Sequence, residues 1–271
     1  MRPEEVGVSE EERAVLEGHL SVEAALRGRS REVFAIYIRQ ERTDQETARL
    51  QRLAKGQGVP VERVPSERIT ELAGGVSHGG VLGLVGARRY LALEELLAGK
   101  HMAAGLAAGA PFIAMLDGVE DPFNFGQCVR ALYAAGADGL VIPPRNWTTA
   151  AGVVARASAG MSELMPTAVS TAPEAAAFLR AQGLVVACTA DRADTIELYQ
   201  ADLCRPLFLV IGGERRGITR SFLDQADLLL RIPYGRHLDA SLGTTAATAV
   251  LAFEVLRQRR NGTQMNADGH G

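Results

Sequence analysis

Cysteine is scarce in this sequence of 271 residues, which limits the sites that it can form. The chain has three cysteines, Cys128, Cys188 and Cys204, and no two of them make a CxxC pair. An odd number of separated cysteines argues against a disulfide framework. We therefore expect no structural disulfides, and a reducing cytoplasm is the expected compartment.

Long apolar runs are also missing. No stretch of about 18 apolar residues is present, so we expect no membrane span. The N-terminal segment MRPEEVGVSEEERAVL is acidic and lacks the apolar core of a signal peptide. These absences favour a cytoplasmic protein that does not act at a membrane.

Lysine is almost absent. Only Lys55 and Lys100 are lysines among the 29 basic residues, so arginine supplies the other 27 (29 minus 2). This bias is typical of a GC-rich genome, and it also suits bidentate contacts to phosphate groups. The net charge is −3. Any contact with a nucleic acid must therefore come from a local patch.

Apolar and charged residues make up 47% and 23% of the chain, which is ordinary for a soluble α/β protein. The first part of the chain predicts a small α/β domain over residues 1–90. Its strands are expected at 33–38, 59–64 and 81–87. Its helices are expected at 44–57, opened by Thr43 or Asp44, and at 66–75, closed by glycine.

Two segments have the composition of connecting chain. The run AAGLAAGAP marks a linker over residues 91–110, with a helix packed on either domain as the alternative. The tail, residues 261–271, is polar and rich in glycine, and we expect it to be disordered.

A second domain is expected over residues 111–260. Continuous apolar strands alternate there with helices, which predicts an α/β fold with a parallel sheet covered on both faces. The expected strands are 112–116, 139–144, 184–190, 207–213 and 228–234, and the expected helices are 126–136, 148–158, 173–182, 219–226 and 241–259.

Three of these strands end in unusual loops, and ligands of parallel sheets bind beyond the carboxyl ends of the strands. In the first loop, DGVEDPFNFGQCVR (117–130), Asn124 and Arg130 lie six residues apart across a loop-to-helix junction. Both can therefore face one crevice. An asparagine turn and a surface arginine are the alternative.

The second loop is IGGERRG (211–217). Gly212 and Gly213 permit close backbone approach, and Glu214 adds a carboxylate at the same end of the sheet. A tight turn with solvated charges is one alternative. A phosphate loop of a nucleotide-dependent oxidoreductase is another, but neither GxGxxG nor GxxxxGK[ST] is present, and a carboxylate repels phosphate.

The third loop, IPYGRHLDASLGTT (232–245), leads from a strand into the last helix. Ser241 and Thr244 are candidate caps for that helix. The small residues after Leu242 allow another segment of the chain to approach closely.

Together, in this order and spacing, the three loops resemble the motifs of the SpoU-type RNA 2′-O-ribose methyltransferases of the SPOUT superfamily. Asn124 and Arg130 match the first motif. The second motif matches Gly212, Glu214 and Gly217, and the third matches Ile232, Pro233, Tyr234, Ser241 and Leu242. The first domain resembles the family's L30e-like substrate-binding domain, through GHLSVEAALRG (18–28) and VSHGGVLGLV (76–85).

The resemblance implies a C-terminal trefoil knot, a homodimer and S-adenosylmethionine as methyl donor, with no metal. It implies a structured RNA as substrate, ribosomal RNA more than transfer RNA, and methyl transfer to a ribose 2′-hydroxyl. It assigns catalytic roles to Asn124, Arg130, Glu214 and Ser241. It assigns the cofactor to Thr189, Gly212, Gly213, Gly217, Ile232 and Leu242.

The chain departs from the family at one position. The asparagine after Ser-Leu is Gly243 here, followed by Thr244 and Thr245, either of which is a candidate for the missing hydrogen bond. A relative that binds RNA or cofactor without full activity is therefore an alternative, as is a transfer RNA methyltransferase. The best local basic cluster is Arg27, Arg29 and Arg31, with a solvated helix end as the alternative.

Overall fold

A computed structural model gives the fold of residues 13–73, 78–98, 110–145, 150–213 and 217–268. The chain divides into two compact units. The first is Met1–Arg89 with Asn146–Leu164, and the second is Tyr90–Arg145 with Met165–Gly271. None of the helices described here is long and apolar enough to cross a membrane.

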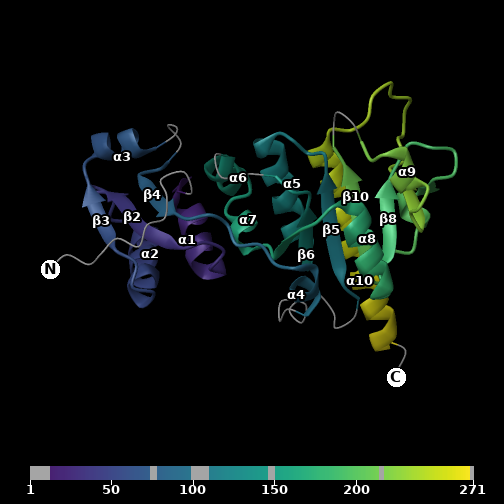
Figure 1. Cartoon of the computed structure of the whole chain (residues 1–271), viewed down its shortest axis with the longest axis horizontal. Helices are drawn as coiled ribbons and strands as arrows, with labels where there is room; N and C mark the ends of the chain where they lie inside the picture. The colour runs from purple at the N-terminus through teal and green to yellow at the C-terminus, as the bar shows by residue number, and fades with distance from the viewer. Residues whose placement is uncertain (1–12, 74–77, 99–109, 146–149, 214–216, 269–271) are drawn as a thin grey trace. The chain divides into compact units, whose positions relative to one another are not determined.

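The first unit contains a four-stranded sheet (Figure 1). Strand β4 pairs antiparallel with both β1 and β2, and β2 pairs parallel with β3. The strands are β1 (Ala14–Glu17), β2 (Val33–Arg39), β3 (Val61–Val64) and β4 (Val81–Val85). The three predicted strands are present. Strand β1 was not expected, because its residues AVLE directly follow the acidic run SEEER.

Helices α1 (His19–Gly28), α2 (Gln45–Gly56) and α3 (Ser66–Leu72) complete the N-terminal part of this unit. The Asp44 side chain accepts a hydrogen bond from the Thr47 backbone N–H at 2.8 Å, so Asp44 rather than Thr43 is the cap of α2. That bond and the neighbouring Arg42 lower the pKa of Asp44 to about 2. Gly74 and Gly75, the glycines expected to close α3, lie outside the described residues.

Two short helices, α6 (Ala151–Ala157) and α7 (Met161–Leu164), follow a strand of the second unit in the sequence but belong to the first unit. A Cβ added at Gly28 would lie 2.2 Å from the Glu163 backbone oxygen, so only glycine allows α7 to approach α1 this closely. A buried ion cluster joins the same elements. Glu163 accepts from Ser30 and from Arg31 Nε, at 2.5 and 3.0 Å, and it lies within ion-pair distance of Arg88.

The second unit is built on a seven-stranded sheet in the order β7-β6-β5-β10-β8-β11-β9. All of its strand pairs are parallel, as predicted. The strands are β5 (Phe112–Asp117), β6 (Gly139–Ile142), β7 (Thr167–Val169), β8 (Val185–Thr189), β9 (Ile196–Glu197), β10 (Leu207–Gly212) and β11 (Leu228–Arg231).

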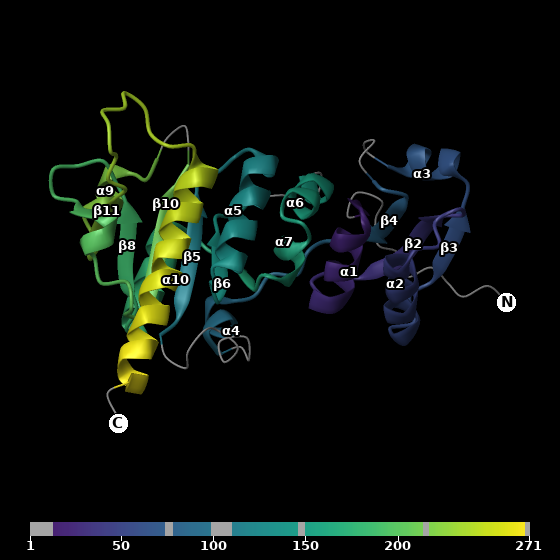
Figure 2. The ribbon, with the colours of Figure 1, turned by 180° about the vertical axis from the view of Figure 1, so that it is seen from behind.

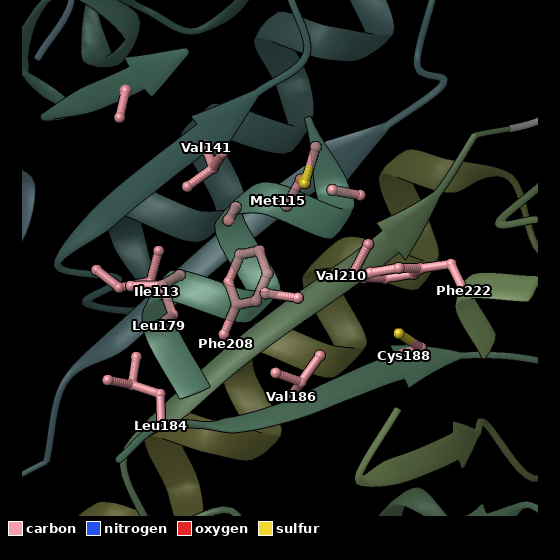
Figure 3. Close-up of a cluster of buried hydrophobic side chains, with 14 of the residues drawn as sticks. Ile113, Met115, Val141, Leu179, Leu184, Val186, Cys188, Phe208, Val210 and Phe222 are labelled. Atoms are coloured by element: carbon pink, nitrogen blue, oxygen red, sulfur yellow. The ribbon is translucent and has the colours of Figure 1, made fainter. Parts of the chain in front are cut away.

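Helices cover both faces of this sheet. Helix α8 (Ala172–Ala181) lies over β8 and β10 in Figure 1, and α5 (Pro122–Ala134) and α10 (Thr244–Asp268) lie on the opposite face in Figure 2. Figure 3 shows the core between α8 and the sheet, where Leu179 meets Phe208 and neighbouring strand residues. The remaining helices are α4 (Leu93–Ala98), η4 (Leu198–Gln200) and α9 (Arg220–Leu223).

Residues 91–110 were expected to be a linker and residues 261–271 a disordered tail, but both segments contain helix. Helix α4 lies within 91–110, and its Leu96 is fully buried in the same core as the sheet residues. This matches the alternative of a packed helix for the part of 91–110 that is described. Helix α10 extends into 261–271, because the sequence after Arg260 contains no proline to stop it.

Candidate active site

The three loops singled out in the sequence begin at neighbouring strands. Asp117 ends β5 and pairs in register with Gly212, which ends β10. Thr189 ends β8 and pairs with Leu230 near the end of β11. Because these strands are parallel, the loops that follow β5, β8, β10 and β11 meet at one edge of the sheet.

The first and second loops touch at a backbone crossing. The Gly213 N–H donates to the Asp117 carbonyl oxygen at 2.6 Å. A Cβ at Gly213 would lie 1.9 Å from the Gly118 carbonyl oxygen, so no other residue fits there without moving a loop. Beside this crossing, the Gly212 N–H donates to the Thr189 hydroxyl at 3.3 Å. Three of the predicted cofactor residues therefore lie together.

The third loop is closed on itself. The Leu242 N–H donates to the Tyr234 hydroxyl at 3.0 Å, across eight residues. Ile232 and Leu242 are half-buried, whereas Ser241 is exposed. Gly217, at the end of the second loop, is exposed with a φ of 59°. Tyr234 is a site residue whose hydrogen bond the sequence pattern did not reveal.

Gly243 occupies the N-cap position of α10. The helix begins at Thr244, and the Gly243 carbonyl accepts the first helical bond, from the Ala247 N–H at 3.0 Å. Neither Ser241 nor Thr244 occupies the cap position, so their expected capping role is not observed. Thr244 is buried, and Thr245 lies 4.0 Å from the Cys128 sulfur of α5.

Helix α5 carries two of the predicted catalytic residues. Asp121 caps it by accepting from the Asn124 N–H at 2.8 Å, and the helix begins at Pro122. The junction therefore lies before Asn124, not between Asn124 and Arg130 as expected. Six residues along a helix correspond to about 120° of rotation, so these two side chains leave α5 from different faces. Asn124 is half-buried and Arg130 is exposed.

Glu214, the remaining predicted catalytic residue, lies outside the described residues. A different carboxyl group is described at the same edge. Asp117 is half-buried at the end of β5, and burial raises the pKa of its carboxyl group. The sequence signal for Asp117 is a carboxylate that directly follows the apolar strand FIAML. An acid directly after a strand is also common in turns, so this signal alone does not mark a site residue.

The basic cluster predicted in the first unit is only partly available to a ligand. Arg31 is buried on Glu163, so its inclusion as a surface cation was wrong. Arg27 and Arg29 are exposed. His19 lies 3.4 Å from Glu46, and the His78 ring nitrogen accepts from the Gly80 N–H, both local structural contacts.

Comparison with protein families identifies both parts of the chain. Residues 111–253 match the SpoU rRNA Methylase family. The chain belongs to this family. Residues 15–91 match a second SpoU-associated model, described as RNA 2′-O ribose methyltransferase substrate binding.

Curated SpoU relatives are similar over most of their length. The chain is 33% identical over 251 residues to the 23S rRNA (guanosine-2′-O-)-methyltransferase RlmB of Shewanella oneidensis, with 91% of this chain and 98% of the relative covered. It is 31% identical to the putative TrmH family tRNA/rRNA methyltransferase YacO of Bacillus subtilis, with 84% and 90% covered.

Solved SpoU structures share the fold. The methyltransferase AviRb of Streptomyces viridochromogenes has a TM-score of 0.74 at 19% identity, with 93% of this chain and 91% of that chain covered. An AdoMet-bound rRNA methyltransferase of Sinorhizobium meliloti has a TM-score of 0.71 at 24% identity, with 92% and 88% covered.

The chemical groups at the edge of the sheet where these loops meet fit S-adenosylmethionine. Backbone groups of three loops, the Thr189 hydroxyl and the half-buried side chains of Ile232 and Leu242 provide neutral hydrogen bonds and apolar surface, which suit adenosine and methionine. The nearby Asp117 carboxyl group suits a ligand that carries positive charge. A phosphate-bearing dinucleotide fits this carboxylate poorly.

Proposed function

We propose that this protein transfers a methyl group from S-adenosylmethionine to a ribose 2′-hydroxyl of ribosomal RNA. The observation that carries the proposal is the convergence of the three family motifs at one edge of a parallel sheet, in a chain whose first unit matches a substrate-binding family. Bound S-adenosylmethionine supplies an activated methyl group, so no metal is required.

Thr189, Gly212, Gly213 and Gly217, together with Ile232 and Leu242 of the third loop, would hold the cofactor. The crossing at Gly213 fixes the first loop against the second, so the loop backbone is preorganised for binding. The Leu242–Tyr234 hydrogen bond does the same for the third loop.

Arg130 acts on the ribose. A guanidinium does not lose its proton in proteins, so Arg130 does not serve as a base, and the proton of the 2′-hydroxyl passes to water as S-adenosylhomocysteine leaves. It stabilises the negative charge that develops on the 2′-oxygen and holds the adjacent phosphate. Asn124, Glu214 and Ser241 position the ribose and the loops, and Asn124 does so from a different face of α5 than Arg130.

The substrate is 23S ribosomal RNA rather than transfer RNA. The names of the RlmB relatives support this choice, since they cover nearly the whole chain. We assign residues 1–90 to an L30e-like RNA-binding domain, which the substrate-binding match over residues 15–91 supports. We assign the methyltransferase domain to residues 111–260, of which 146–164 belong to the first compact unit. Cytoplasm, where ribosomal RNA is processed, is the proposed compartment.

The catalytic unit forms a homodimer and carries a trefoil knot near its second and third loops. Exposed apolar side chains on two adjacent helices support the dimer: Phe123 and Tyr133 on α5, and Phe253 on α10. In water, such a surface favours association with a second copy.

A methyl-transfer assay tests the proposal. Unmodified transcripts of bacterial 23S ribosomal RNA and transfer RNA are incubated with the protein and labelled S-adenosylmethionine, and 2′-O-methylation is mapped. We expect one modified ribose in the 23S transcript. Modification of transfer RNA alone would contradict the substrate. Cofactor binding without any methyl transfer would instead identify an inactive relative.

A further inference from the structure

Helices α1 and α2 of the first unit carry a basic surface that is not part of the candidate active site. These helices and the cap of α1 carry five cations, which we name the α1–α2 patch: Arg27, Arg29, Arg49, Arg52 and Lys55. All five residues are exposed. They stand out because the whole chain has a net charge of −3.

Few carboxylates neutralise this patch. Glu23 is shared by Arg27, at 3.5 Å, and Arg49, at 2.9 Å, so one acid serves two cations. Among the described residues, Arg29, Arg52 and Lys55 lie within ion-pair distance of no carboxylate. Glu46, the other acid of these helices, pairs instead with Arg42 and His19 at the opposite end of α2.

The carboxyl-terminal ends of the two helices are joined, which brings the free cations together. The Gln57 side chain, at the end of α2, donates to the Leu26 backbone oxygen of α1 at 3.0 Å. Arg29 therefore lies near the end of α2 that carries Lys55. Two aligned helix ends also add negative dipole character, which favours cations even without a ligand.

The backbone at Arg29 points to more than a solvated helix end. Arg29 caps α1 in the left-handed region, with φ 49° and ψ 30°, a position where glycine is the usual residue. A glycine is present one position earlier, at Gly28, where the close approach of α7 excludes a side chain. A strained arginine at an exposed cap is typical of a functional side chain.

We propose that the α1–α2 patch is the surface of the first unit that binds the phosphate backbone of the substrate RNA. Five exposed cations on two adjacent helices suit a row of phosphates, and arginine donates two hydrogen bonds to each. The contacts are independent of base sequence, so the patch contributes affinity and orientation. This inference rests on the proposed function for the identity of the RNA.

Salt-dependent binding tests the patch. The full chain with Arg29→Ala, Arg52→Ala and Lys55→Ala is compared with wild type for binding to a 23S ribosomal RNA transcript between about 50 and 200 mM salt. The logarithm of the binding constant falls linearly with the logarithm of the salt concentration, and each lost phosphate contact makes this negative slope shallower by roughly 0.7 to 0.9. We expect the slope to be smaller in magnitude by about 2 to 3, and the affinity at about 50 mM salt to be lower on the order of a hundredfold.

A control variant carries the same change in charge at exposed arginines of this unit outside α1 and α2: Arg13→Ala, Arg68→Ala and Arg89→Ala. It should bind RNA nearly as tightly as wild type, and both variants should keep the cofactor affinity and melting temperature. Wild-type affinity in the patch variant, or an equal loss in the control, would overturn the proposal. RNA binding is measured independently of methylation. If the RNA binds through the patch but is not methylated, the proposed function is refuted and the proposal for the patch stands.

Discussion

Arg130 is the residue on which the proposed chemistry depends most. It is exposed on α5 and therefore free to reach an RNA substrate. We expect Arg130→Ala to lower kcat by roughly 100-fold or more, because a cation at the developing alkoxide acts mainly in the transition state. Cofactor affinity, measured by calorimetry, should not change. The matched control is Arg205→Ala, also exposed; a similar loss there would remove Arg130 from its role.

The Asp117 carboxyl group has opposite expected effects on the stability of the free protein and on its affinity for S-adenosylmethionine. Burial raises the pKa of its carboxyl group in the folded state above the unfolded value. The stability linked to this group is therefore present below the unfolded pKa and is lost as pH rises through the folded pKa. Asp117→Asn should raise the melting temperature of the free protein at pH 7, with the difference vanishing near pH 3 to 4.

The same substitution should weaken S-adenosylmethionine binding, because an amide does not attract a positive ligand. For this one variant, thermal melting should show higher stability, and calorimetry should show weaker binding of the cofactor. A variant that is more stable yet binds the cofactor as tightly as wild type would exclude Asp117 from the cofactor site.

Gly243 is less damaging than its departure from the family motif suggests. It serves as the N-cap of α10, and glycine is only a few tenths of a kcal/mol worse there than asparagine. A Cβ at this position would meet nothing within 4 Å. We expect Gly243→Asn to raise the unfolding free energy by about 0.5 kcal/mol with activity retained.

The control for this variant is Gly235→Asn, in the same loop and with equally open space around the added Cβ. It should give no stabilisation in urea denaturation, because residue 235 is not at a helix cap. A destabilised Gly243→Asn protein would show that Gly243 is required for the loop conformation.

At the scale of elements, the segment α6–α7 carries the most specific interaction. Glu163 is buried with Arg31, Arg88 and Ser30. Burial alone would raise its pKa, but the two arginines outweigh burial and lower it. Glu163→Gln should cost about 3–5 kcal/mol of unfolding free energy, because it leaves buried arginine charge uncompensated.

The effect should also depend on pH. Stability from Glu163 is present above the unfolded pKa and is lost as pH falls through the lowered folded pKa. Urea denaturation at pH 7 and at low pH measures this loss in the wild type. Glu71→Gln, which removes an exposed partner of Arg68, should change stability by less than about 1 kcal/mol.

The sequence predicts elements well where a periodic apolar pattern is long. All the strands expected in the parallel sheet are present, because their runs of apolar residues are buried on both faces. Strands β1, β7 and β9, with the sequences AVLE, TAV and IE, were not predicted. The packing of α6–α7 with the first unit depends on Glu163 and Gly28, whose partners are distant in sequence.

The candidate site was predictable in its location but not in its details. Loops at strand ends follow from the sheet, and Gly212, Gly213 and Thr189 do lie together. The burial of Arg31 and the start of α5 before Asn124 were not predictable, because both depend on tertiary contacts or a capping residue, Asp121.

At the scale of the whole molecule, the exposed aromatic side chains Phe123, Tyr133 and Phe253 define the α5–α10 face, the candidate interface of the proposed homodimer. Phe253 is 48% exposed near the middle of α10, and Phe123 is 55% exposed at the start of α5. Burying such aromatic side chains contributes roughly 1.5–3 kcal/mol each. A dimer that uses this face would therefore lose much of its affinity if a charge were placed at its centre.

Phe253→Asp should convert the protein from dimer to monomer at micromolar concentration, because an unpaired carboxylate would be buried in the interface. Light scattering after gel filtration measures the mass, and a methyl-transfer assay on the same fractions measures the activity. The matched control is Tyr199→Asp, since Tyr199 is 57% exposed but lies on η4. It should remain a dimer. If both variants keep the wild-type mass, the α5–α10 face is not the interface; if wild type itself is a monomer, the catalytic loops must function within one chain.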